Sequence, residues 1–206
     1  MRHVFNALLV VLLSMSLVSA SSKAAPESGA SELVDRFQST LLDVMQNADQ
    51  LGYSGRYEQL KPVFISSFDV PYISRLVLGR YWKTLDRDQK TEFIKTFIGY
   101  GIAAAASLFD EYNEETFRPA NEERLESGRV VIRTELVKAD GEIVHLDYLL
   151  HEKNGRWYIL NVIANGVSDL SLKRAEYTAV IRDQGFDALL AEIREKTAEY
   201  NKIAAN

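Results

Sequence analysis

The chain has 206 residues and a formal net charge of −5, with 29 acidic residues against 24 Lys and Arg. This balance argues against nucleic acid as a partner and against direct adsorption to an acidic membrane, because both attract basic surfaces. The chain contains no cysteine, which excludes a disulfide framework and a lipid attached through a thiol.

The N-terminus has the layout of a secretory signal peptide. Arg2 and His3 precede an almost continuous apolar run over residues 4–18, and small residues follow it. The run is shorter than the ~20 residues that a membrane-spanning helix needs. We therefore expect cleavage after Ala20 or Ala24, with an uncleaved membrane anchor as the alternative.

These features divide the chain into a signal peptide, residues 1–24, and one α+β domain, residues 25–206. The remaining length is enough for a single hydrophobic core. An exported chain without cysteines fits a freely soluble protein of the periplasm, and we expect that location.

The first half of the domain has the spacing of helices. Ser31 is a candidate cap for a first helix, whose apolar residues recur every three or four positions as far as Gly52. A second helical stretch, residues 57–66, is interrupted by Pro62, and a third over residues 71–78 ends before a glycine. This part of the chain is therefore predicted to be helical.

A longer helix follows. Asp86 and Gln89 form a capping-box pattern at its start, and Phe93 and Phe97 lie one turn apart within it. Residues 99–106 are mostly Gly and Ala, and this patch permits either close packing of another element or room for a ligand chain.

From Thr116 the periodicity is that of strands. Residues 129–138, 142–153 and 156–164 read as three strands joined by Asp-Gly and Asn-Gly turns, which predicts an antiparallel meander. Two more helices close the chain, one ending at Gly185 and one following it.

The Asn-Gly turn sets the register of the second hairpin. A two-residue turn would pair Leu150 with Ile159 and Tyr148 with Asn161. The residues predicted to face the core from these two strands are Val144, Leu146, Tyr148, Leu150, Trp157, Ile159, Asn161 and Ile163.

In the first hairpin, a three-residue loop with a left-handed Gly141 fits best. It turns the alternate residues Val130, Ile132, Thr134 and Leu136 toward the core. A two-residue loop would bury Arg133 and Glu135 instead, at a cost on the order of several kcal/mol each. The preferred register places Arg133 opposite Asp147 and Glu135 opposite His145 on the outer face.

The same strand offers the best candidates for acid–base chemistry. His145, Asp147 and His151 share one face by alternation. The two histidines are too far apart along a strand to bind one metal ion directly, and the charge pairs above explain the residues equally well. A small acid–base enzyme and a periplasmic adaptor without ligand therefore remain as alternative functions.

Several motifs, in this order, resemble the MlaC or toluene-tolerance family. Residues 77–82 contain a Leu-Gly-x-x-Trp helix end. Residues 85–97 contain the start of a helix that carries a glutamine, Gln89, and two phenylalanines, Phe93 and Phe97. Residues 166–185 contain a Gly-Val-Ser turn before a helix with an arginine three residues ahead of an aromatic residue. Together these motifs span most of the predicted domain.

The chain also departs from the family pattern. Asn161 stands where the family usually has Asp, and Leu172 and Lys173 replace a common Asn-Tyr pair. These departures resemble a divergent branch such as the hopanoid-associated HpnM proteins, so the cargo implied is a phospholipid or a hopanoid-like lipid.

The resemblance implies a cone-like α+β fold, in which helices at both ends surround a curved antiparallel sheet and a deep apolar pocket. It implies a soluble carrier that encloses lipid chains and exchanges them with an inner-membrane transporter complex and an outer-membrane lipoprotein complex. No enzymatic step, metal or cofactor is implied. The alternating strand pattern alone favours a closed core, whereas the resemblance favours a pocket.

The residues that we expect to contact lipid come from the long helix, its preceding helix end and the sheet. They are Trp82, Phe93, Phe97, Ile132, Leu136, Leu146, Tyr148, Leu150, Trp157, Ile159 and Ile163.

Overall fold

The structure is a computed structural model that describes residues 29–203, and the expected signal peptide and its cleavage sites lie outside them. Its helical half consists of α1 (Gly29–Gln46), α2 (Ala48–Ser67), α3 (Val70–Leu78), the 3₁₀ helix η1 (Gly79–Lys83) and α4 (Arg87–Leu108). The strands are β1 (Thr116–Arg124), β2 (Val130–Val137), β3 (Ile143–Lys153), β4 (Arg156–Ala164) and β5 (Val167–Ser168). Helices α5 (Asp169–Gln184) and α6 (Phe186–Ile203) follow.

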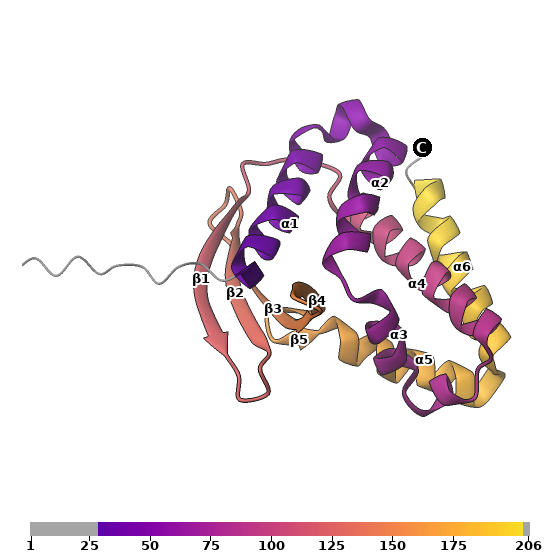
Figure 1. The fold of residues 1–206 in the computed structure, drawn as a ribbon. Helices are drawn as coiled ribbons and strands as arrows, with labels where there is room; N and C mark the ends of the chain where they lie inside the picture. Colours follow the sequence, from indigo (N-terminus) through magenta and orange to yellow (C-terminus); the bar gives the residue numbers. More distant parts are fainter. Residues whose placement is uncertain (1–28, 204–206) are drawn as a thin grey trace, which may run out of the picture.

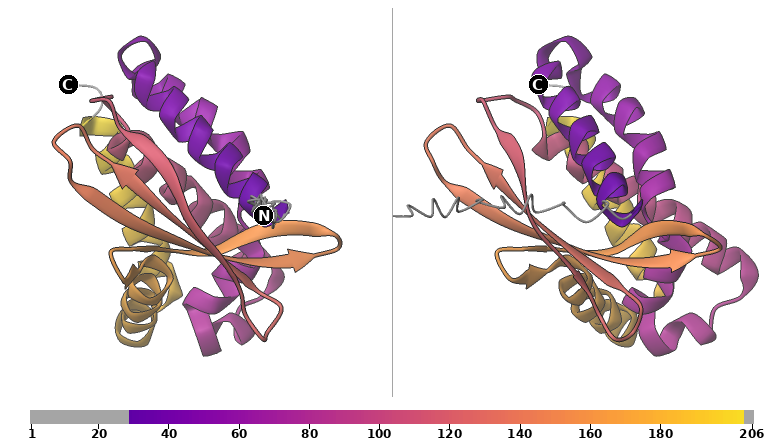
Figure 2. Two further views of the ribbon diagram at one scale, coloured as in Figure 1. Left: turned by 90° about the vertical axis from the view of Figure 1, so that its left-hand side faces the viewer. Right: turned by 60° about the vertical axis from the view of Figure 1, so that its left-hand side comes forward.

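The sheet and the helices form successive layers, and the predicted α+β class is confirmed. The strands pair antiparallel in the order β1-β2-β3-β4-β5. Helix α1 lies on the sheet, with α2, α4 and α6 stacked beyond it (Figure 1). Figure 2 shows that the sheet is strongly twisted and covers one side of the helices. No helix among residues 29–203 is long and apolar enough to cross a bilayer.

The helix boundaries follow local signals at two sites. The capping box is confirmed, because the Gln89 backbone N–H donates to Asp86 at 2.8 Å and the Asp86 N–H donates to the Gln89 side chain at 3.0 Å. Helix α3 ends at Gly79, whose φ of 54° favours glycine.

The predicted limits of the first helix are wrong. Helix α1 already includes Gly29 and Ala30, so Ser31 lies inside it, and the Ser31 hydroxyl donates to Glu122 at 2.7 Å. The helix ends before Asn47, whose side-chain amide donates to the Asp43 carbonyl at 2.8 Å and competes with the backbone. Gly52 instead forms a kink inside α2, with φ 54°. Helix α2 also continues through Pro62, which we expected to interrupt it.

The first hairpin has the predicted register. The backbone N–H of Lys138 donates to the Glu142 carbonyl across a three-residue loop, and Gly141 has φ 86°. Arg133 lies opposite Asp147, and Glu135 lies opposite His145. Strand β1 was not predicted, because it is an exposed edge strand whose Pro119 and adjacent bulge break the alternation.

The second hairpin follows the predicted register only near its turn. Leu150 pairs with Ile159 as predicted, but a bulge then shifts the pairing, so that Tyr148 lies opposite Val162 rather than Asn161. Beyond the bulge Ile163 lies opposite Asp147, so its predicted place on the core face with Tyr148 is wrong. A bulge inserts one residue and reverses the facing of all residues after it.

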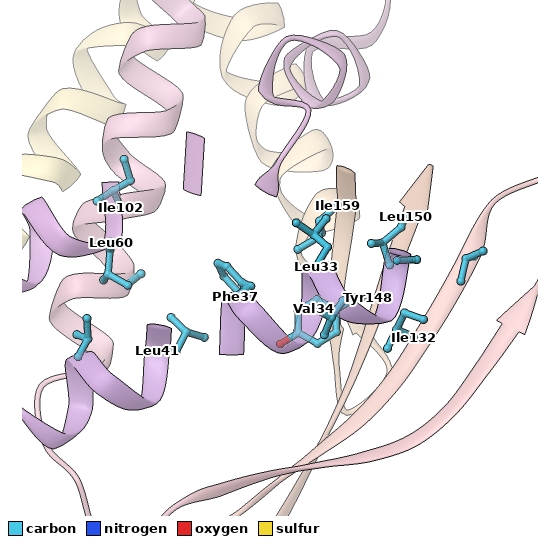
Figure 3. Packing of buried hydrophobic residues seen from close by; sticks show 14 of the residues in the cluster. Leu33, Val34, Phe37, Leu41, Leu60, Ile102, Ile132, Tyr148, Leu150 and Ile159 are labelled. Atoms are coloured by element: carbon cyan, nitrogen blue, oxygen red, sulfur yellow. The ribbon is translucent and has the colours of Figure 1, made fainter. Parts of the chain in front are cut away.

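The bulge lets β4 contribute to two apolar clusters. Ile159 is fully buried in a first cluster between α1, α2, α4 and the sheet, part of which Figure 3 shows. Its neighbour Leu160 is 1% exposed and belongs to a second cluster between α3, α4, α5 and α6. Adjacent residues of one strand therefore anchor both halves of the molecule.

The outer face of the sheet provides a first test. The Arg133 guanidinium lies 2.6 Å from Glu123 and 3.7 Å from Asp147, and all three side chains are about one third exposed or more. Asp147→Asn should therefore change the free energy of unfolding by less than ~1 kcal/mol, the range of exposed ion pairs. Urea denaturation measures this, and a loss above ~2 kcal/mol would contradict a solvated, structural pair.

Candidate functional site

An apolar cavity of about 110 Å³ lies where the two clusters meet. Helix α3 forms one wall with Val70, Ile73 and Val77, whose spacing of three and four residues puts them on one helical face. The corner before α3 adds Phe68. These side chains are wholly apolar, so this wall offers contacts suited to hydrocarbon.

Helix α4 and strand β4 form the opposite walls. Helix α4 contributes Phe97, Ile98 and Gly101, and β4 contributes Leu160 and Val162 on either side of Asn161. A Cβ atom at Gly101 would meet nothing within 4 Å, so this glycine leaves open space beside the helix. The small-residue patch thus combines open space at Gly101 with close packing at Ala103, Ala105 and Ala106, which are buried, and its role in holding a ligand chain stays a prediction.

Asn161 is the buried polar residue of this wall, and its amide is occupied. Its Nδ2 donates to the Ser168 hydroxyl at 2.9 Å, and its Oδ1 accepts the Leu170 backbone N–H at 3.1 Å. Asn161 therefore fixes the turn from β5 into α5 and satisfies the need of a buried amide for partners.

The N-terminal end of helix α5 closes the cavity. Asp169, Leu170 and Lys173 line it there, and the Asp169 side chain is 64% exposed. Because an exposed residue belongs to the lining, the cavity reaches the surface at this end. Asp169 and Lys173 are its charged residues among those that the structure describes.

The corner between α2 and α3 is attached to the edge of β4. Phe68 forms a parallel bridge to Ile159, whose carbonyl accepts the Asp69 N–H at 3.3 Å. The Asp69 carboxylate, 3% exposed, accepts hydrogen bonds from the Tyr72 backbone N–H at 3.2 Å and from Lys153 at 2.9 Å. The corner and the start of α3 are thereby tied to the sheet.

These contacts change the titration of Asp69. Burial alone would raise the pKa of its carboxyl, but the hydrogen bonds from Lys153 and Tyr72 outweigh burial and hold the pKa below the ordinary 3.8. His151, 3.2 Å away, also faces this carboxylate. Asp69 is therefore a buried anion in the folded protein.

The candidate catalytic residues do not converge. His145 and Asp147 are directed to Glu135 and Arg133, whereas His151 contacts Asp69. Residues 29–203 contain no group of three His, Cys, Asp or Glu side chains arranged to hold a metal ion. Each of these side chains has a structural partner instead.

A glycine and an arginine from separate motifs meet where the end of α3 contacts α5. A Cβ atom at Gly79 would lie 3.4 Å from the Arg174 guanidinium, which therefore rests directly against the end of α3. The Leu-Gly and Gly-Val-Ser motifs thus correspond to one contact between α3 and α5.

The sequence model described as MlaC protein matches residues 35–195. The chain belongs to the MlaC family. It is similar to the intermembrane phospholipid transport system binding protein MlaC of Haemophilus influenzae, at 22% identity over 135 residues, which cover 64% of this chain. The match spans 63% of that relative's length, less than two thirds. The proposed hopanoid-associated branch stays a prediction.

The solved structures include a protein of the same fold. The phospholipid-binding protein of Ralstonia solanacearum, determined in complex with a phospholipid, aligns with a TM-score of 0.75 at 16% identity. The alignment covers 84% of this chain and 99% of the other. The MlaC fold is thus shared at low sequence identity.

Among the residues expected to contact lipid in this MlaC-family chain, Phe97 lines the cavity. Phe93 stacks on it at 5.6 Å and is fully buried, while Trp82 packs against the second cluster. The strand residues Ile132, Tyr148, Leu150 and Ile159 are buried in the first cluster, and Leu146 and Trp157 pack on its border. Leu136 and Ile163 are half-buried and lie outside both clusters.

Most residues of the cavity wall are not among those that the sequence predicts to contact lipid. The apolar stripe of α3, with Val70, Ile73 and Val77, was visible as helical spacing but was not considered as lining. Leu160 is absent from the residues predicted to face the core, because the bulge that turns it inward leaves no clear sequence signal. In the sequence, Lys173 stands out only as a departure from the family pattern.

The position of Ile159 gives a second test. Ile159 is fully buried against α1 and does not line the cavity. Ile159→Trp should therefore overpack the first cluster and lower the free energy of unfolding by ~1–3 kcal/mol. Thermal and urea denaturation measure this loss. A variant of unchanged stability that loses bound lipid would instead place residue 159 in a ligand site.

Asp69 gives a third test. Asp69→Asn should lower the free energy of unfolding at pH 7 by ~1–3 kcal/mol, because the Lys153 ammonium and the Tyr72 N–H lose their buried anionic acceptor. The stability that Asp69 contributes through its lowered pKa is fully present above pH 3.8, the ordinary pKa of the group. This stability is lost as the pH falls through the pKa that Asp69 has in the folded protein. The difference between wild type and variant should therefore shrink in acid. Denaturation across pH measures it, with Asp147→Asn as the exposed control, and a pH-independent difference would contradict this account.

Proposed function

We propose that this protein is a periplasmic lipid carrier, which encloses the apolar chains of a lipid and exchanges it with partner complexes in the inner and outer membranes. The observation that carries the proposal is the apolar cavity between β4 and helices α2 to α5 in a chain of the MlaC family. The names of the two related proteins, which refer to phospholipid, support a phospholipid as cargo.

Enclosure is required by the energetics of transfer. Each methylene kept from water contributes ~0.8 kcal/mol, so two chains with ~30 methylenes account for ~25 kcal/mol. A carrier that left half of this surface in water would not remove a lipid from a bilayer. Since the bilayer is equally apolar, exchange between membrane and carrier can be almost neutral.

The cavity must widen to hold such chains. Its volume of about 110 Å³ is well below the ~300–1,000 Å³ of pockets for drug-sized ligands. Helix α3 is the wall best suited to move, because it has nine residues and is bounded by an extended Phe68 and a left-handed Gly79. We propose that chains enter by displacing α3 from α4 while the first cluster stays closed.

The proposed activity is binding and transfer without a chemical step, so no cofactor takes part. Direction of transport is then a property of the membrane partners. An adaptor without ligand would share the fold and the surface, but it would not contain lipid after purification.

The fourth test fills the cavity at Gly101. Gly101→Leu adds a side chain where a Cβ meets nothing within 4 Å, and a helical glycine is replaced by a better helix former. We expect the variant to fold at least as stably as wild type and to retain less than about half of the lipid, because the added side chain occupies the cavity. Organic extraction and mass spectrometry measure lipid per protein.

The matched control is Gly99→Leu, in the same helix but outside the cavity lining, where a Cβ would lie 3.8 Å from the Tyr57 hydroxyl. It should keep the wild-type lipid content. Wild-type protein without extractable lipid, and without uptake of lipid from vesicles, would refute the carrier function and favour an adaptor.

A further inference from the structure

The surface end of the cavity carries a lysine that is mostly buried. The Lys173 side chain is 17% exposed, and its ammonium lies 4.7 Å from the centre of the Tyr100 ring. Its ion-pair partner among the described residues is Asp169, one helical turn earlier, at 3.6 Å. None of the side-chain hydrogen bonds found within residues 29–203 involves Lys173.

This environment leaves hydrogen-bond donors of the Lys173 ammonium available. A lysine ammonium has three donors, and since no hydrogen bond found among residues 29–203 uses them, they are available to a ligand oxygen. The contact with Tyr100 is a cation–π interaction and supplies no acceptor oxygen. Asp169 is largely exposed at the long distance of 3.6 Å, so this ion pair between neighbouring turns contributes little and is easily opened.

The position of the pair matches the chemistry of a lipid molecule. In a glycerophospholipid the phosphate is attached to the same glycerol unit that carries the two chains, so it lies near the mouth of any cavity that encloses them. Lys173 and Asp169 line this cavity where it reaches the surface. The N-terminus of α5 is at the same place, and its dipole favours negative charge there.

We propose that Lys173 and Asp169 form a headgroup subsite for a zwitterionic lipid with a phosphodiester and an amine. Lys173 donates to a phosphate oxygen, and Asp169 accepts from the amine, so the two opposite charges of the pair match the two of the ligand. A phosphatidylglycerol headgroup also satisfies Lys173, but it offers Asp169 neutral hydroxyl donors in place of a charged ammonium, so its contact with this carboxylate is weaker. The inference rests on the proposed carrier function and assigns its headgroup preference.

The test is lipid uptake from vesicles by purified, delipidated protein. Vesicles of phosphatidylcholine contain equal minor amounts of phosphatidylethanolamine, phosphatidylglycerol and diacylglycerol, and mass spectrometry quantifies each lipid in the re-isolated protein. Wild type should enrich phosphatidylethanolamine over phosphatidylglycerol. Lys173→Met keeps the apolar stem, and it should lower both phospholipids relative to diacylglycerol by about tenfold, the effect of one charge-assisted hydrogen bond.

Asp169→Asn should lower the ratio of phosphatidylethanolamine to phosphatidylglycerol by about threefold, since Asp169 is exposed and partly screened. The controls are Lys61→Met and Glu58→Gln, which alter a helical ion pair of the same 3.6 Å length that does not line the cavity. Both should behave as wild type. Melting temperatures verify that every variant is folded.

The possible outcomes separate the two hypotheses. If wild type takes up lipid and the Lys173 and Asp169 variants take up the same mixture, the headgroup subsite is wrong and the carrier function stands. If wild type takes up no lipid of any class, the carrier function fails and the subsite with it. Stabilisation of wild type, but not of Lys173→Met, by inorganic phosphate alone would identify a free-phosphate site and would also overturn the inference.

Discussion

The attachment of the α2–α3 corner to the edge of β4 is the constraint on which the cavity depends. Phe68 and Asp69 pair with Ile159 through the backbone, and the Asp69 carboxylate at once caps α3 and binds Lys153. Without this corner, α3 would have no fixed position over the sheet. With it, the apolar stripe of a short helix is held at a distance from α4 and leaves a cavity that packing does not fill.

The β4 bulge has a matching role on the side of the sheet. A regular strand would direct Ile159 and Leu160 to opposite faces, one of them toward solvent. Here both are buried, because the corner and α5 cover the region beside the bulge. At the bulge, the closed cluster under α1 therefore lies next to the second cluster, against which the cavity-lining Phe97 packs. The two clusters meet at Ile159 and Leu160 of β4.

The sequence was sufficient wherever the determining interaction was local. The Asp86 capping box, the glycine end of α3 and the loop at Gly141 each involve residues within a few positions, and each was predicted correctly. The cavity was not predictable in this way. Its wall depends on the β4 bulge and on contacts such as Asp69 with Lys153, whose partners are 84 residues apart. The motif resemblance identified the family, but most of the strand residues chosen for contact with lipid lie in the closed cluster or on its border.

The two clusters differ in ways that suit a carrier. The first contains a buried polar group, in which Gln38 donates to Thr134 at 2.8 Å and to the Tyr148 hydroxyl at 3.2 Å. Burial raises the pKa of Tyr148 to about 12, so its hydroxyl stays neutral, and this network fixes α1 on the sheet in one arrangement. The wall of the cavity, apart from the α2–α3 corner, Asn161 and the charged pair at the mouth, is held mainly by non-directional apolar contacts. Apolar contacts of this kind can be exchanged for contacts with lipid chains at little cost, whereas the Gln38 network cannot be opened without leaving buried polar groups unpaired. The molecule therefore divides into a half that a buried polar network holds in one arrangement and a half in which, under the proposed function, lipid chains replace apolar contacts.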